Sequence, residues 1–224
     1  MKFAAVAGGV ALAAGVALVP SSGSAEASAH RPRLGAAHHR HGSSKATKAE
    51  LKARLLTISD LPAGWSVSHT SPTGGIASSQ CVSGLASHKH GPTATASFSQ
   101  GNTPVLDELL SSYQAKRWAG AVRKLDRCKS LAVTEPANAG SLGASTQLKL
   151  AIGQLSFPAV ADGSHSWSLS ASATGLTLGA DVVAFHAGRY AAIVLYADLG
   201  SPDITAVESM VDAAAKKLEP APQT

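Results

Sequence analysis

The sequence predicts an α+β fold: a mostly antiparallel sheet packed with helices, in a single domain behind a signal peptide and a basic arm. Helical patterns near both ends and in the middle of the chain, with strand-like segments between them, favour this class. The sharpest strand signal is a hairpin over residues 181–197, with Gly188 in its turn. The 224 residues are 45% hydrophobic and 15% charged, so the chain can bury a core.

Residues 1–29 have the layout of a secretory signal peptide. Lys2 provides a short positive start, an apolar run follows from Phe3 to Val19, and two A-x-A sites precede residue 30. We expect cleavage after Ala29. The alternative is an uncleaved signal anchor, because the run nearly reaches spanning length. The protein is therefore expected to be secreted or otherwise extracytoplasmic.

Residues 30–46 are expected to form a flexible, basic, histidine-rich arm. The stretch 30–49 holds five Arg or Lys residues, four His and no acid, whereas basic and acidic residues from Glu50 onward number 13 each. This charge count does not indicate a compact basic patch for nucleic acid in the body, so no nucleic-acid partner is expected. The arm could contact anionic envelope polymers or lipid head groups, or it is a solvated spacer.

Two groups of histidines are the candidate metal ligands. His38, His39 and His41 lie in the arm, and His88 and His90 lie in the body. Neither group has a Cys or a carboxylate at a recognised ligand spacing. The P-loop and the dinucleotide-binding glycine motif are absent from the sequence. We therefore expect neither a metal site nor a cofactor.

The domain is expected to span residues 47–219, followed by a tail at 220–224. A capping box, Thr47-x-x-Glu50, opens its first helix. The apolar face of this helix is expected to hold Leu51, Leu55 and Ile58.

The next segments alternate between strands and loops. Residues 65–69 and 93–100 have strand character, and residues 70–80 are rich in Gly, Pro, Ser and Thr, which indicates a loop. Residues 104–113 are ambiguous between strand and helix.

A second helix is expected from about residue 114 to residue 129, because apolar residues recur there at spacings of four and three: Trp118, Val122, Leu125 and Cys128. Residues 135–143 indicate a loop. Strands are expected over residues 145–155 and 165–170.

The C-terminal hairpin pairs residues 181–186 with residues 190–197. Both faces of its second strand are apolar, so we expect that strand to be central and covered on both sides. A last helix follows, with Ser201 as its expected N-cap and Pro202 at its first position. Its buried stripe is expected to contain Ile204, Val207, Val211, Ala214 and Leu218.

Cys81 and Cys128 are the two cysteines of the chain. Because the chain is expected to be exported, a disulfide between them is the natural prediction. The alternative is a catalytic or redox thiol. That alternative is disfavoured because there is no C-x-x-C motif and Cys128 lies on an apolar helix face.

No catalytic motif is present. The sequence lacks both G-x-S-x-G and H-E-x-x-H. A Ser/His/Asp set could be assembled from the many serines with His165 or His186 and Asp162 or Asp181, but such a set has no value without geometry. We therefore expect no enzyme activity and no catalytic residue.

The segment from Leu55 to Trp65 carries a resemblance to a known family. It follows the "LL-x-x-x-DLPAGW" opening of many exported actinobacterial proteins. Further matches keep the family order: Phe98 in a strand, the helix ending at Cys128, residues 158–164 as a loose version of a "P-x-x-G-D-x-S" turn, the hairpin around Gly188, and the helix start at residues 197–203. Over about residues 48–219, the chain resembles the extracellular sensor-type domains of mycobacterial serine/threonine kinases and their free-standing secreted or lipoprotein relatives.

The resemblance implies a sheet packed with helices, a ligand-binding cleft and no enzymatic activity. The chain departs from the family in lacking a lipid-attachment cysteine, in having one cysteine pair where kinase sensors tend to have two, and in having Ala161 where the turn usually has Gly. These departures favour a free exported binding module.

The expected function is therefore that of an exported, non-enzymatic ligand-binding domain of the bacterial cell envelope. Its partner would be a small or lipidic ligand or a cell-wall component. Trp65, His165 and Arg189 are the residues we expect near a ligand cleft. Two alternatives remain: a secreted serine hydrolase with an unrecognised triad, and an adhesion protein that binds cell wall through its basic arm.

Overall fold

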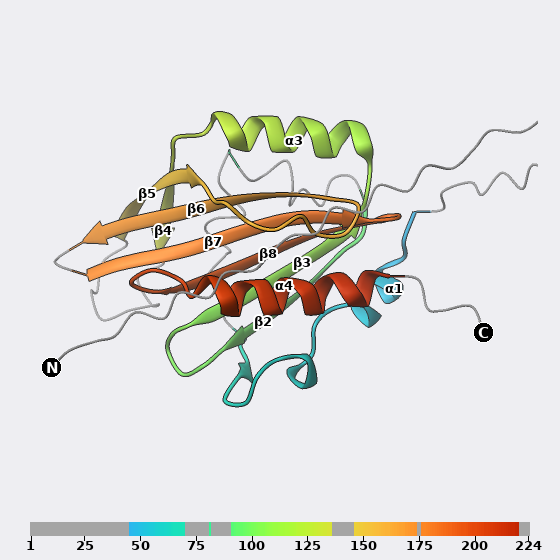
Figure 1. Ribbon diagram of the computed structural model, residues 1–224, viewed down its shortest axis with the longest axis horizontal. Coiled ribbons are helices and arrows are strands. Elements are labelled where there is room, and N and C mark those ends of the chain that lie inside the picture. Colours follow the sequence, from blue (N-terminus) through green and yellow to red (C-terminus); the bar gives the residue numbers. More distant parts are fainter. Residues whose placement is uncertain (1–44, 70–80, 82–90, 136–145, 174–175, 220–224) are drawn as a thin grey trace, which may run out of the picture. The chain divides into compact units, whose positions relative to one another are not determined.

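The computed structural model describes residues 45–69, 81, 91–135, 146–173 and 176–219. The predicted signal peptide, nearly all of the arm, the loop at 70–80 and the tail lie outside these residues. In the described part, one antiparallel sheet of eight strands has helices on both faces (Figure 1). The predicted α+β fold with an antiparallel sheet is confirmed.

Along the chain, helices alternate with groups of strands. They are α1 (Lys48–Ala53), the 3-10 helix η1 (Ile58–Asp60), β1 (Ser66–Val67), β2 (Thr93–Ser99), β3 (Val105–Ser112), α3 (Ala115–Arg127), β4 (Ser130–Glu135), β5 (Thr146–Gln154), β6 (Gly163–Ala173), β7 (Leu176–Ala187), β8 (Tyr190–Leu199) and α4 (Ile204–Leu218). The strand order is β1-β2-β3-β8-β7-β6-β5-β4. β8 therefore inserts between β3 and β7, and this pairing joins the first strands of the chain to the last ones.

The face of the sheet that carries α1 and α4 buries the larger core. Side chains alternate between the two faces of a strand, so Leu106, Glu108 and Leu110 of β3 point to this side. Val183 and Phe185 of β7 join them. α4 covers this face with a stripe that includes Val207, Met210, Val211, Ala214 and Leu218.

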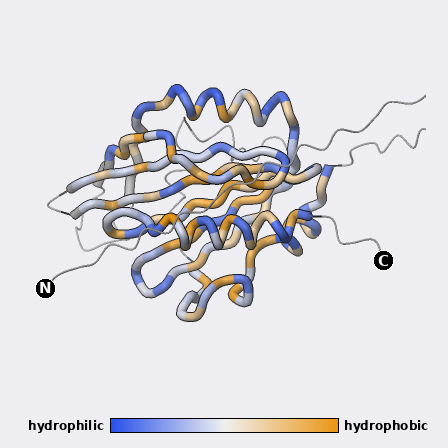
Figure 2. Tube along the Cα trace, viewed as in Figure 1, coloured by the Kyte–Doolittle hydropathy of each residue, from blue (hydrophilic) through white to orange (hydrophobic). Residues whose placement is uncertain are grey.

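The opposite face packs against α3. Ala121, Val122 and Leu125 of the helix meet the alternate residues of the central strands, among them Val182 and Leu195. Hydrophobic positions gather on the central strands and hydrophilic ones along α3 (Figure 2). β8 contributes to both cores, as its two apolar faces predicted.

Local signals located most element starts. The capping box is present, with Thr47 Oγ1 accepting from the N–H of Glu50 and a Glu50 carboxylate oxygen accepting from the N–H of Thr47. The helix is shorter than expected: it ends at Ala53, and Ile58 lies in η1 with a 40% exposed side chain. The ambiguous segment 104–113 forms β3, in which the three consecutive residues Leu106, Asp107 and Glu108 are all buried because both faces of the strand are covered.

The predicted start of the last helix and the predicted loop at residue 135 need correction. Pro202 precedes the helix, and Ile204, predicted in its buried stripe, is 37% exposed. Ser201 is not the N-cap of the last helix; Asp203 is, and its carboxylate accepts from the N–H of Thr205. The chain between β8 and α4 passes close to β7, since a Cβ on Gly179 would overlap the carbonyl oxygen of Gly200, and the helix begins beyond this contact. In addition, Glu135 ends strand β4 and does not begin a loop.

Candidate functional site

The sheet face that packs against α3 is only partly covered, and it carries both apolar and polar side chains. One register row crosses four strands and consists of Leu109, Ile193, Ala184 and His165, from β3, β8, β7 and β6. Leu109 and Ile193 are half-buried, whereas Ala184 is fully buried. Small and half-exposed apolar side chains in the middle of a sheet leave a surface that an apolar group can contact.

An aromatic cluster stands at one end of this surface. The rings of Tyr113 and His186 are stacked, with centroids 4.1 Å apart and planes 13° apart. Trp118 presents its ring edge-on to both, at 6.0 Å from Tyr113 and 5.7 Å from His186. We call these three residues the aromatic cluster.

Three elements hold the aromatic cluster in place. Tyr113 follows β3, and its N–H donates to the carbonyl oxygen of Arg189 in the β7–β8 turn, at 2.7 Å. Trp118 lies in the first turn of α3, and His186 is near the end of β7. The β3–β8 pairing is what brings these distant segments together.

His186 has an unused hydrogen-bonding atom. Its Nδ1 is buried and has no hydrogen-bond partner in the described part of the chain. Burial lowers the pKa of His186, His165 lowers it further, and Asp162 acts in the opposite direction. The imidazole is therefore neutral at pH 7. A neutral ring with an unpartnered nitrogen can form one hydrogen bond, and a ligand reaches the buried Nδ1 only by displacing the side chain that covers it.

A second aromatic pair fixes α3 on the sheet. The indole N–H of Trp167 on β6 donates to the Asp126 carboxylate of α3 at 3.0 Å. The ring of Trp167 lies nearly parallel to that of His165, with centroids 6.1 Å apart. This pair has a structural role at the end of α3 away from the aromatic cluster.

The opposite face holds a buried carboxyl group that sequence reasoning missed. Glu108 is 1% exposed; its Oε2 accepts from the N–H of Leu56 at 2.6 Å, and its Oε1 is unpartnered among the described residues. Burial raises its pKa to about 7, partly offset by the Leu56 bond and by Lys217, while Asp60 raises it. Lys217 and Asp60 form an ion pair at 2.6 Å. The strand–helix ambiguity of residues 104–113 hid the direction of this side chain.

The predicted disulfide is confirmed. Cys81 and Cys128 are bonded, with their Cα atoms 6.2 Å apart, and Cys81 packs against the α3-side core. The bridge ties Cys81 to the end of α3. A disulfide is compatible with an extracytoplasmic location.

The three residues expected near a cleft do not lie together. Trp65 is buried in the α4-side core and its ring is 6.2 Å from that of Tyr196. His165 is exposed on the α3 side. Arg189 is in the β7–β8 turn, and its guanidinium pairs with Glu50 at 2.7 Å. This turn is at the opposite end of β8 from Tyr196, the neighbour of Trp65, so Arg189 lies about 20 Å from Tyr196 at a strand rise of about 3.3 Å per residue.

No metal-binding group of three or more His, Cys, Asp or Glu side chains occurs among the described residues. The histidines of the arm, His88 and His90 lie outside them. Within the described part, neither His165 nor His186 forms a hydrogen bond with a serine hydroxyl or an Asp carboxylate; Asp162 instead accepts from the N–H of Gly188 at 2.6 Å. The serine-hydrolase alternative stays a prediction.

A search for membrane-spanning helices among the described residues finds none that is long and apolar enough. No protein-family model matches the chain, and no match to a curated protein was found.

Proposed function

We propose that this protein is an exported, non-enzymatic ligand-binding domain of the bacterial cell envelope, and that its ligand is a small or lipidic molecule. The aromatic cluster of Tyr113, Trp118 and His186 is the observation that carries the proposal. Ring faces contribute apolar contact area, and the unpartnered Nδ1 of His186 offers one directional bond once a ligand displaces the side chain that covers it. This combination suits a ligand with an apolar body and a polar group.

Two further observations support the proposal. The disulfide between Cys81 and Cys128 fits an exported protein. The resemblance of the Leu55–Trp65 segment to exported sensor-type domains implies the same class of function. The half-buried Leu109 and Ile193, on the same face of the sheet as His186, extend the apolar surface beside the cluster.

The test is native mass spectrometry of the protein purified from its own culture supernatant. We expect a reproducible mass adduct that denaturation removes. The variant His186→Phe keeps a ring to stack on Tyr113 and loses both nitrogens, so it should lose most of the adduct. His69→Phe is the matched control, because His69 is exposed and lies after β1, outside the cluster.

Two outcomes would contradict the proposal. One is a bare native mass together with no change in tryptophan fluorescence when envelope lipid extracts are added. The other is labelling of a single serine by a serine-directed phosphonate, which would support the hydrolase alternative. The mass of the denatured protein also tests the predicted cleavage after Ala29. A variant that lacks residues 30–49 tests the adhesion alternative, in which the arm holds the protein on the cell wall.

A further inference from the structure

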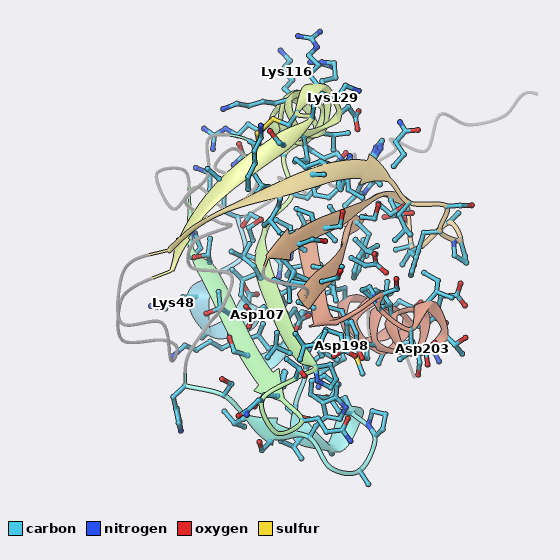
Figure 3. The ribbon with its side chains drawn as sticks, turned by 90° about the vertical axis from the view of Figure 1, so that its left-hand side faces the viewer. Lys48, Asp107, Lys116, Lys129, Asp198 and Asp203 are labelled. Carbon is cyan, nitrogen blue, oxygen red and sulfur yellow. A yellow bond between two sulfur atoms is a disulfide. The ribbon has the colours of Figure 1, made fainter. Side chains whose placement is uncertain are left out.

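Helix α3 concentrates positive charge on the outside of the domain. Of its 13 residues, five are basic and one is acidic; the basic ones are Lys116, Arg117, Arg123, Lys124 and Arg127, all of them exposed. None of the five forms an ion pair in the part of the chain that the structure describes. Figure 3 shows Lys116 and Lys129 at the α3 end of the domain, with Asp198 and Asp203 toward α4.

The neutral charge count of the body concealed this segregation. From Glu50 onward the chain has 13 basic and 13 acidic residues. Removing the five bases and one acid of α3 leaves eight bases and 12 acids, so α3 is net +4 and the rest of the body is net −4. A neutral total for the body therefore coexists with a local concentration of positive charge on α3.

The five bases form one straight stripe. At about 100° per residue they fall within a sector of about 120°, on the side of the helix opposite the buried Ala121, Val122 and Leu125. From Lys116 to Arg127 the stripe is about 17 Å long, at about 1.5 Å per residue. Gly120 lies within the stripe and adds no side chain. Asp126 lies beside it, and its carboxylate is bonded to Trp167.

This arrangement works against the stability of the helix itself. Lys116 and Arg117 lie in the first turn, where the helix dipole disfavours cations, and that turn contains no acid. Arg123 and Arg127 are four residues apart and repel each other by about 0.2–0.5 kcal/mol. A solvated helix face that only maintains solubility usually mixes both signs. An unbalanced stripe of this kind is characteristic of a surface that meets negative charge.

The partner must be recognised by charge and not by apolar insertion. The exposed large apolar side chains among the described residues are on other elements: Ile58, Val67, Leu199 and Ile204. A helix that enters a bilayer interface presents large apolar residues to it, and α3 turns its own toward the sheet. Three of the five bases are arginines, whose forked donors suit phosphate oxygens. The stripe is one helix wide, which fits a chain better than a plane.

We propose that the basic stripe of α3 binds a linear, phosphate-bearing polyanion. This surface lies on the outer side of α3, away from the aromatic cluster, and the proposal does not depend on the ligand-binding function. It also differs from contact through the basic arm, because it uses the residues of helix α3 at the spacing that the helix fixes.

The experiment measures binding of long-chain inorganic polyphosphate to the full mature chain at several salt concentrations. A stripe variant replaces Lys116, Arg123, Lys124 and Arg127 with Gln. A control variant replaces four exposed lysines elsewhere with Gln: Lys48, Lys52, Lys149 and Lys216. Both variants lose the same net charge and keep the arm. We expect the stripe variant to bind at least about tenfold more weakly, and its salt slope to fall by about 0.7 for each phosphate group that it no longer neutralises.

Three results would overturn the proposal. They are equal loss of binding in both variants, no polyphosphate binding by the unchanged protein, and binding to phosphatidylglycerol vesicles that depends on the stripe while polyphosphate binding does not. Urea unfolding checks that the fold is intact in both variants. The stripe variant should unfold at about the same urea concentration, because the loss of Lys116 relieves an unfavourable contact with the helix dipole and the loss of Lys124 and Arg127 removes favourable ones.

Discussion

At the scale of single residues, Glu108 gives the clearest pH prediction. Its pKa is about 7 in the folded protein and has the ordinary value of 4.5 in the unfolded chain. The folded state therefore holds the proton more tightly. The contribution of Glu108 to stability is greatest below pH 4.5 and falls as the pH rises through 7, by about 3 kcal/mol in total. The cause is the burial of a carboxylate whose Oε1 is unpartnered among the described residues.

Glu108→Gln removes this pH dependence. The amide keeps an oxygen for the N–H of Leu56 and does not titrate. We expect the unfolding free energy of the variant, measured in urea from pH 4.5 to pH 8, to fall less steeply than that of the unchanged protein. Asp212→Asn, which changes an exposed carboxylate of α4, should keep the original slope. Identical slopes for all three proteins would show that Glu108 does not titrate in this range.

Residue-level patterns predicted backbone roles better than side-chain environments. Thr47 and Glu50 were predicted as a capping pair because a cap depends on neighbours in sequence. The environment of Glu108 depends on α1 and α4, far away along the chain, so no local pattern contains it. Ala161 is different: its positive φ of 51° is a conformation that glycine adopts more easily, and the resembled turn usually has Gly at this position.

At the scale of elements, the disulfide is the strongest constraint on α3. It joins residues 47 apart, and the chain-entropy model gives such a link about 4 kcal/mol of stabilisation. We expect Cys81→Ser/Cys128→Ser to lower the unfolding free energy by an amount of this order, measured in urea. A reductant should destabilise the unchanged protein and leave the variant unaffected. If reductant has no effect on the unchanged protein, the bond contributes nothing to stability.

Elements with a strong period or a local signal were predicted correctly, and weak ones were missed. The spacing of Trp118, Val122 and Leu125 located α3, and the turn at Gly188 located the β7–β8 hairpin. β4 was missed because its six residues at the sheet edge pair with β5 alone. β3 stayed ambiguous because apolar residues occupy both of its faces, a pattern that fits a buried strand or a helix.

At the scale of the whole domain, the two cores should unfold together. β7 gives Val183 to the α4-side core and Val182 to the α3-side core, so neither core survives without the shared strands. Trp65 reports on the first core, and Trp118 and Trp167 report on the second. In urea, Trp65→Phe and Trp118→Phe/Trp167→Phe should each show one fluorescence transition that coincides with the loss of secondary structure. Separate midpoints within one variant would show that one side opens alone.

The candidate site could not be assembled from the sequence because it depends on the pairing of β3 with β8. That pairing joins segments that are far apart along the chain, Val105–Ser112 and Tyr190–Leu199, and sets Tyr113 beside the turn that contains Arg189. The location of the positive charge could not be predicted from the sequence either. The total for the body is zero, and only the placement of α3 on the outside of the sheet shows where its positive charge lies.

The contact between the two ends of the domain limits how early the domain can fold while the chain is being made. Arg54, just after α1, donates to the carbonyl oxygens of Lys217 and Glu219 at the end of α4. A ribosome makes Arg54 early and Lys217 163 residues later. The α4-side core therefore cannot close until α4 has been made, so nearly the whole chain must be synthesised before this core can form.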